Sequence, residues 1–158
     1  MPESERIKLE RIRDEIIEKA FPELKEEKIV IDYRKLYYSF FDCGRLPEGR
    51  FYLWVDESLK GVHIDILKGG IAHDLVHILS DKEQDKSAST LDFYLYGNWE
   101  RYRILDERNT DLGTIIRGYG EELLLLMKYT ENNGHPYIKD DGLSIREIEI
   151  ILSLGKPK

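Results

Sequence analysis

The feature that most constrains the fold is a change of hydrophobic period between residues 28 and 67. Four short segments in this interval, KIVIDY, KLYYSFFDC, RFYLWVD and GVHIDIL, are rich in β-branched and aromatic residues. The turn-prone sequences LPEG and SLKG separate some of them. Such runs, bounded by turn residues, are typical of strands. We therefore expect three or four strands of a small, mostly antiparallel sheet.

Helical periods flank this interval. Residues 9–20 place their apolar side chains on one stripe, and Pro22 follows, which predicts an N-terminal amphipathic helix. The pair Gly69–Gly70 is expected to punctuate the chain before apolar residues return at helical spacing, and SIRE at 144–147 predicts a capping box before a last helix. The expected architecture is α+β: an N-terminal helix, the small sheet, then further helices, in one domain spanning residues 1–158.

The composition limits the cellular compartment and the kinds of binding partner that we expect. The only cysteine, Cys43, can form no internal disulfide, which favours a cytoplasmic protein, and we interpret it as a small buried hydrophobe. A formal net charge of -7 argues against a nucleic-acid partner. The charged N-terminus and the lack of any run of about eighteen apolar residues argue against export and against a membrane partner. Charged residues make up 35% of the chain, which is typical of a thermophile protein with surface ion pairs.

Two of the four histidines lie four residues apart in GGIAHDLVHILSD. Positions four apart on an α-helix differ by about 40° around the axis and about 6 Å along it. The imidazoles of His73 and His77 can therefore converge on one ion. A catalytic zinc site takes three ligands from the protein, so the third must come from elsewhere.

The best source of a third ligand is LDERNTDLGTIIRGYG, where Glu107 and Asp111 are again four residues apart. Ile104, Ile115 and Gly118 share their stripe, which predicts a face turned inward. A buried carboxylate is costly unless it ligates a metal or hydrogen-bonds a ligating histidine. The opposite stripe repeats apolar residues at helical spacing and is expected to be core: Tyr102, Leu105, Leu112, Ile116, Tyr119 and Leu123.

HDLVH, followed thirty residues after His77 by ERNTD, resembles the HExxH…ExxxD arrangement of gluzincin-type zinc metallopeptidases, in particular the small, minimal zincin-like proteins. The resemblance covers residues 73–111. It implies a zincin-like fold in which His73, His77 and Glu107 bind Zn²⁺ and Asp111 supports the ligands without binding the metal. It also implies a peptide or protein substrate.

One position departs from that family's pattern. The family has Glu after the first histidine, as the general base toward metal-activated water, and this chain has Asp74. Aspartate is one methylene shorter, and a misplacement of about 1 Å can cost about a hundredfold in rate. We expect a zinc-dependent hydrolase with Asp74 as the general base, or a site that binds metal and catalyses poorly.

Three other interpretations remain open. The protein could be a non-catalytic zincin-fold binding module with a structural or vestigial metal site. It could be an HD-type metal-dependent phosphohydrolase, in which His63, His73, Asp74 and Asp111 could be recruited as metal ligands. That interpretation leaves His77 unexplained. It could also hold no site, with core histidines and with Glu107 and Asp111 on a solvated face paired to Arg103 and Arg108. This last interpretation requires several independent coincidences.

Substrate contacts are expected from aromatic and strand residues. Tyr94, Tyr96 and Trp99 could form a substrate wall, a partner-binding patch or part of the core. RFYLWVD is the expected edge strand on which an extended peptide would add by main-chain pairing. His135 or Tyr119 could donate to an oxyanion.

Overall fold

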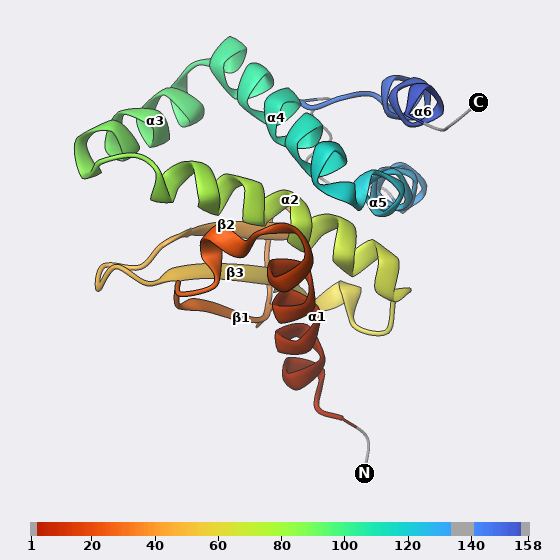
Figure 1. The fold of residues 1–158 in the computed structure, drawn as a ribbon, viewed down its shortest axis with the longest axis horizontal. Helices are drawn as coiled ribbons and strands as arrows, with labels where there is room; N and C mark the ends of the chain where they lie inside the picture. Colours follow the sequence, from red (N-terminus) through yellow and green to blue (C-terminus); the bar gives the residue numbers. More distant parts are fainter. Residues whose placement is uncertain (1–2, 134–140, 156–158) are drawn as a thin grey trace.

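The computed structural model describes residues 3–133 and 141–155, and its fold is α+β, as predicted (Figure 1). The helices are α1 (Glu5–Ala20), α2 (Ile64–Lys82), α3 (Lys86–Asn98), α4 (Glu100–Thr114), α5 (Gly120–Asn132) and α6 (Ile145–Leu154). The strands are β1 (Ile29–Arg34), β2 (Phe41–Arg45) and β3 (Phe51–Asp56). The predicted N-terminal helix is confirmed, and so is the capping box of Ser144 and Glu147 at the start of α6.

The sheet has the strand order β1-β3-β2 and is mixed, not mostly antiparallel. β2 and β3 form an antiparallel hairpin, and β1 occupies the other side of β3 in a parallel pairing. After β1 the chain crosses to the other side of β3 before it forms β2. The local sequence does not indicate on which side of the hairpin β1 pairs. RFYLWVD is therefore the central strand, which corrects its assignment as the edge. The edge strand nearest α2 is β2 (Figure 1).

The segment GVHIDIL is not a strand. Its last four residues form the first turn of α2, and the side chain of His63 caps this helix by accepting a hydrogen bond from the backbone N–H of Asp65. The alternating isoleucines at positions 64 and 66 mimic a strand pattern, because the helical period becomes visible only from Leu67 onward.

Gly69 and Gly70 lie inside α2 and do not interrupt it. A Cβ at residue 69 would lie 2.4 Å from the carbonyl oxygen of Glu122 in α5, and a Cβ at residue 70 would lie 2.1 Å from the ring of Phe41 in β2. The two glycines therefore permit close approach of α5 on one side and of the sheet on the other. This packing fixes α2 between the sheet and the remaining helices (Figure 1).

The predicted core stripe of α4 is wrong. Leu105 is 62% exposed and Ile116 is 82% exposed. Tyr119 and Leu123 of that stripe are buried, but they follow a kink at Gly118, whose φ of +96° only glycine adopts readily. The buried residues of α4 itself are Thr110, Asp111 and Thr114. The helix thus turns its polar side toward α2.

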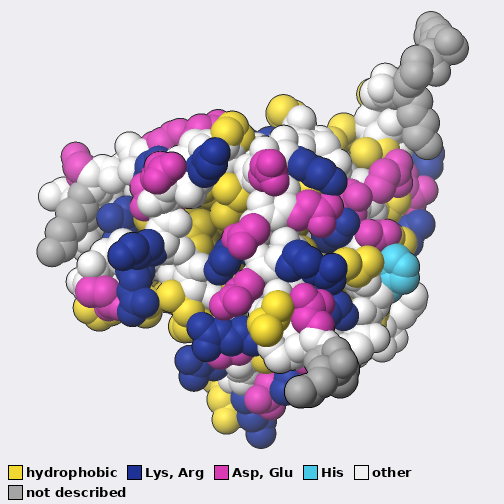
Figure 2. Space-filling view, turned by 60° about the horizontal axis from the view of Figure 1, so that its bottom comes forward, with side chains coloured by type: hydrophobic (Ala, Val, Ile, Leu, Met, Phe, Trp, Pro, Cys, Tyr) yellow, Lys and Arg dark blue, Asp and Glu magenta, His cyan; other side chains and the backbone are white. Residues whose placement is uncertain are grey.

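Charged side chains of both signs cover the surface. On the face in Figure 2, lysine and arginine side chains are interspersed with aspartate and glutamate. Among the described residues, several of these charges form ion pairs, for example Arg6 with Glu10 and Arg117 with Glu23. None of the described helices has the length and apolarity needed to cross a membrane.

Candidate metal centre

His73 and His77 lie on successive turns of α2, with their ring centroids 4.9 Å apart. Both side chains are largely buried and face α4. Because α2 is packed on both sides, the two imidazoles are held on a rigid element, as a metal site requires.

Glu107 on α4 meets both imidazoles. Its Oε2 lies 3.1 Å from His73 Nε2, and its Oε1 lies 3.1 Å from His77 Nε2. Donors around a tetrahedral zinc ion, bound at about 2.0–2.1 Å, lie about 3.3 Å apart. Each of the two distances taken alone suits donors around one ion, and each also suits a hydrogen bond or ion pair between an imidazole and the carboxylate.

The other ring nitrogens also face carboxylates. His73 Nδ1 lies 3.3 Å from Asp74 Oδ1, and His77 Nδ1 lies 3.6 Å from Asp106 Oδ2. A carboxylate beside Nδ1 favours the tautomer with its proton there, which directs the Nε2 lone pair toward Glu107. In that neutral tautomer two lone pairs would face one carboxylate, and either a proton on each Nε2 or a metal ion between them removes the repulsion.

Electrostatics in the cluster favour positive charge. Burial alone would lower the pKa of His73, but Glu107, Asp111 and Asp74 outweigh it and raise the pKa well above its ordinary value. For His77 the effect of burial is likewise overcome by Glu107, and its pKa is raised. Burial would raise the pKa of Glu107, but His73 and His77 lower it. Protons supply this positive charge in the absence of metal, and a metal ion can replace them.

Asp111 lies behind the ligands and is fixed by the C-terminal segment. It is 1% exposed; its Oδ1 lies 3.2 Å from His73 Nε2, and its Oδ2 accepts a hydrogen bond from the backbone N–H of Leu143 at 2.8 Å. Arg103 and Arg108 pair elsewhere, with Asp141 and Glu147. The interpretation of Glu107 and Asp111 as a solvated face paired to these arginines is therefore wrong.

Two groups of side chains in the described part of the chain could hold a metal ion. His73, Asp74 and His77 offer donor atoms within 4.8 Å of one another, and so do His77, Asp106 and Glu107. Imidazole and carboxylate donors suit zinc and other divalent first-row metals.

Two buried carboxylate oxygens support the same conclusion. Asp74 Oδ2 has no hydrogen-bond partner within the described residues, whereas Asp111 Oδ1, which also lacks a hydrogen bond there, faces His73 Nε2 as an ion pair at 3.2 Å. An orphaned buried carboxylate oxygen costs free energy, and a nearby cation offsets that cost. The residues present thus fit a divalent metal ion.

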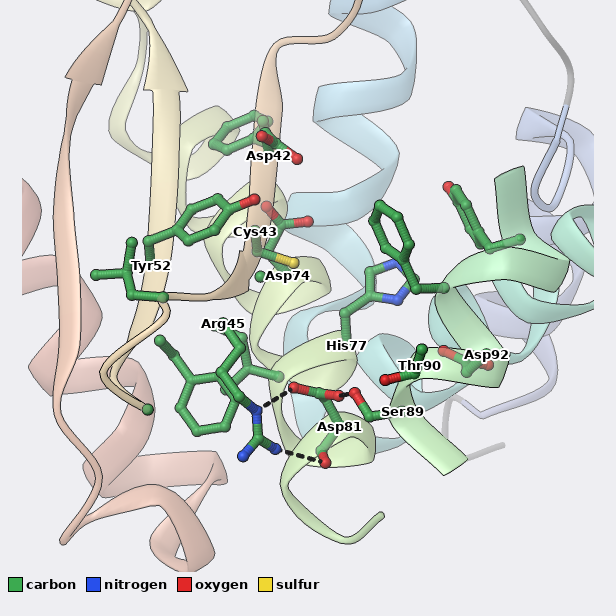
Figure 3. A pocket seen from close by; sticks show the side chains of 18 of the residues that line it. Asp42, Cys43, Arg45, Tyr52, Asp74, His77, Asp81, Ser89, Thr90 and Asp92 are labelled. Carbon is green, nitrogen blue, oxygen red and sulfur yellow. Dashed lines mark hydrogen bonds and ion pairs between the residues drawn. The ribbon is translucent and has the colours of Figure 1, made fainter. Parts of the chain in front are cut away.

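The cluster opens into a pocket of about 750 Å³ between β2, α2, α3 and α4 (Figure 3). Asp74, His77 and Glu107 line it, whereas His73 and Asp111 lie behind its wall. Asp74 is nearly buried, at 5% exposed, and lies near Asp42 of β2 in Figure 3. A ligand in the pocket would therefore contact the exposed side of the cluster and the edge strand together.

Several residues singled out in the sequence lie away from this site. His63 is exposed, about 15 Å along the α2 axis from His73, which removes it from the ligand set of an HD-type phosphohydrolase. Tyr119 packs in the core near Lys19 and does not line the pocket. Tyr94 and Trp99 are exposed. His135 lies outside the described residues.

Other site residues had no clear signal in the sequence. The hydroxyl of Tyr96 donates to Glu107 Oε1 at 2.6 Å, so one member of the aromatic cluster contacts the centre. Tyr52 lines the pocket. Its burial and, to a smaller extent, the nearby negative charge of Asp42 raise its pKa to about 12. Cys43 is half-buried in the pocket wall and packs against the core; burial raises the pKa of its thiol well above the ordinary value. A thiol held protonated is a poor nucleophile.

The chain matches no family model, no curated protein and no solved structure. The case for a metal centre therefore rests on the contacts of α2 with α4.

Proposed function

We propose that the protein is a zinc-dependent hydrolase of the metallopeptidase type, with His73, His77 and Glu107 as metal ligands. The observation that carries the proposal is the position of Glu107, whose two carboxylate oxygens face the Nε2 atoms of both histidines at 3.1 Å. Bound zinc would supply a Lewis acid that polarises a carbonyl and acidifies water.

The surrounding residues hold the ligands in place. Asp106 Oδ2 faces His77 Nδ1 at 3.6 Å as an ion pair, and Tyr96 donates a hydrogen bond to Glu107, so His77 and Glu107 each have a partner on α3 or α4. Such outer contacts fix the tautomer and rotamer of a ligand. Asp111 acts in the same way toward His73.

Asp74 is the proposed general base. One of its carboxylate oxygens lies within 4.8 Å of a ring nitrogen on each histidine, and the side chain borders the pocket. A substrate peptide would lie along β2, whose edge faces the pocket, and would add to the sheet by main-chain pairing. β3 cannot do this because β1 and β2 flank it on both sides.

One observation favours a second candidate, a non-catalytic module with a structural or vestigial metal site. Asp74 Oδ1 lies 3.3 Å from His73 Nδ1. In this candidate, Asp74 orients His73 and takes no part in proton transfer.

The first experiment is elemental analysis by mass spectrometry on protein purified without chelator. Wild type should contain about one zinc per chain, and His77→Ala should contain none, because removal of a ligand lowers zinc affinity by orders of magnitude. His63→Asn is the matched control: it changes an exposed histidine outside the cluster and retains a capping acceptor for Asp65. Zinc that persists in His77→Ala would contradict the ligand assignment.

Two variants of Asp74 separate the candidates. If Asp74 is the base, Asp74→Asn should keep zinc and lose peptide hydrolysis, whereas an orienting Asp74 should lose zinc affinity by about tenfold or more in the same variant. Asp74→Glu introduces the longer carboxylate that the metallopeptidase pattern has at this position, and its side chain has room to extend into the pocket. It should raise the hydrolysis rate if reach is the limitation, and an unchanged rate would favour the non-catalytic module.

A further inference from the structure

We infer that the pocket beside the metal centre binds a cationic side chain, and that the substrate is a peptide with lysine or arginine next to the scissile bond. This inference rests on the proposed function for the scissile bond, but the charge recognition stands on the pocket itself.

The pocket wall is strongly acidic. Its described residues include seven carboxylates against one guanidinium, that of Arg45. Arg45 is already engaged, since its Nε lies 3.0 Å from Asp81 Oδ2 (Figure 3). Glu48 is likewise paired, with Arg50. A divalent ion at the centre would neutralise only part of the remaining negative charge.

Four carboxylates of this wall have no lysine or arginine partner among the described ion pairs, besides the ligand Glu107: Asp42, Asp74, Asp92 and Asp106. They come from β2, α2, α3 and α4, so the charge surrounds the pocket and does not lie on one side. This gathering differs from the face in Figure 2, where the two signs are interspersed.

Asp74 gives a second sign of a missing cationic group, besides the charge of the pocket wall. It is 5% exposed, it lines the pocket, and its Oδ2 has no hydrogen-bond partner within the described chain. Such an oxygen needs a donor. A guanidinium or ammonium group supplies donors and the opposite charge together, which a neutral side chain does not.

The shape of the pocket agrees with a long side chain. Asp42 on β2 and Asp92 on α3 lie on different elements that line the same pocket, which has a volume of about 750 Å³ (Figure 3). A peptide paired with the β2 edge would project alternate side chains from its backbone. One of these would extend toward the acidic wall while the peptide bond lies near the histidines.

The test measures binding, not hydrolysis. Two fluorescein-labelled peptides of the same sequence are compared, one with three arginines in an alanine and glycine background and one with citrulline, an uncharged analogue of arginine, in their place. Fluorescence anisotropy is recorded with protein supplied with one equivalent of zinc chloride. The arginine peptide should bind about tenfold more tightly or better, because unscreened opposite charges a few Å apart contribute at least that much.

A pair of double variants separates the pocket from the overall charge. Asp42→Asn with Asp92→Asn removes two pocket charges, and the amide at residue 92 still accepts the hydrogen bond from Tyr102. Glu18→Gln with Glu149→Gln removes two exposed charges outside the pocket. The pocket variant should lose most of the preference for arginine, and the surface variant should keep it, with circular dichroism confirming that both fold.

Equal binding of the two peptides, or an equal loss in both double variants, would overturn the inference. Parallel peptide cleavage distinguishes the two claims. Cleavage without preference for arginine over citrulline would overturn the inference and leave the proposed hydrolase intact. Pocket-dependent arginine binding without any cleavage would support the inference and count against the hydrolase.

Discussion

Substitution of Gly142 by alanine should weaken metal binding although residue 142 holds no ligand. A Cβ at this position would lie 2.2 Å from Asp111 Oδ2, where an ordinary contact is more than 3 Å. The backbone of Gly142 does not have a positive φ, so alanine introduces no backbone strain. The carboxylate of Asp111 must therefore move by about 1 Å, a displacement that can cost about a hundredfold where alignment matters.

This movement has two consequences, one for metal affinity and one for stability. Near His73, the loss of an outer carboxylate contact lowers metal affinity by about 10- to 100-fold, or about 1.4–2.8 kcal/mol. At the other oxygen, the hydrogen bond from the buried N–H of Leu143 is stretched beyond its 2.8 Å length. An unsatisfied buried group costs about 1–3 kcal/mol of unfolding free energy.

Zinc affinity is measured by competition with a chromophoric chelator, and stability by urea unfolding of the metal-free protein. Gly155→Ala is the control, because its new Cβ meets nothing closer than 3.7 Å and it lies beyond the site on the same C-terminal segment. If Gly142→Ala lost stability but bound zinc as tightly as wild type, Asp111 would have no part in the centre.

Three further predictions concern single contacts. Tyr96→Phe removes the donor 2.6 Å from Glu107 and should lower zinc affinity by about tenfold in the same competition assay; an unchanged affinity would mean that the hydroxyl does not hold the ligand. Leu75→Ala truncates a fully buried side chain and should lower the urea unfolding free energy by about 2–5 kcal/mol, and a loss below 1 would contradict the packing of α2. Arg108 lowers the pKa of Glu147 to about 2, so the carboxylate stabilises the fold above its unfolded pKa of about 4.3 and this contribution is lost as pH falls toward 2. The difference in melting temperature between wild type and Glu147→Gln should accordingly shrink between pH 6 and pH 3, and a constant difference would refute the pairing.

Much of the fold was accessible from the sequence because local chemistry decides it. Ser144 and Glu147 form their capping box as predicted, and the apolar stripe ahead of Pro22 forms α1. The parallel pairing of β1 with β3 was not accessible, since it depends on which edge of a hairpin a distant strand occupies. GVHIDIL was misassigned because two isoleucines at alternate positions fit a strand as well as the start of a helix.

The site was predictable to a different degree at each residue. The spacing of His73 and His77 placed both rings on one face of a helix, and the structure brings Glu107 beside both rings. Asp106 was missed, and Tyr96 was named only as part of an aromatic cluster, because the approach of both residues to the centre depends on how α3 and α4 pack, which periodicity does not encode. Asp74 directly follows His73, but its contact with His73 Nδ1 depends on the rotamers of both side chains, which periodicity does not encode.

The burial of α4 is the strongest physical argument for function in this chain. Hydrophobic pattern alone would turn Leu105 and Leu112 inward, yet both are exposed while Asp111 and Thr114 are buried. Burial of a carboxylate costs several kcal/mol unless partners stabilise it, and exposure of large apolar side chains forgoes about 1.5–3 kcal/mol each. A helix selected only for stability would rotate about its axis to exchange these faces. The contacts of α4 with His73 and His77 oppose that rotation, and an inverted pattern of this kind is what a site on the buried face of a helix would cost.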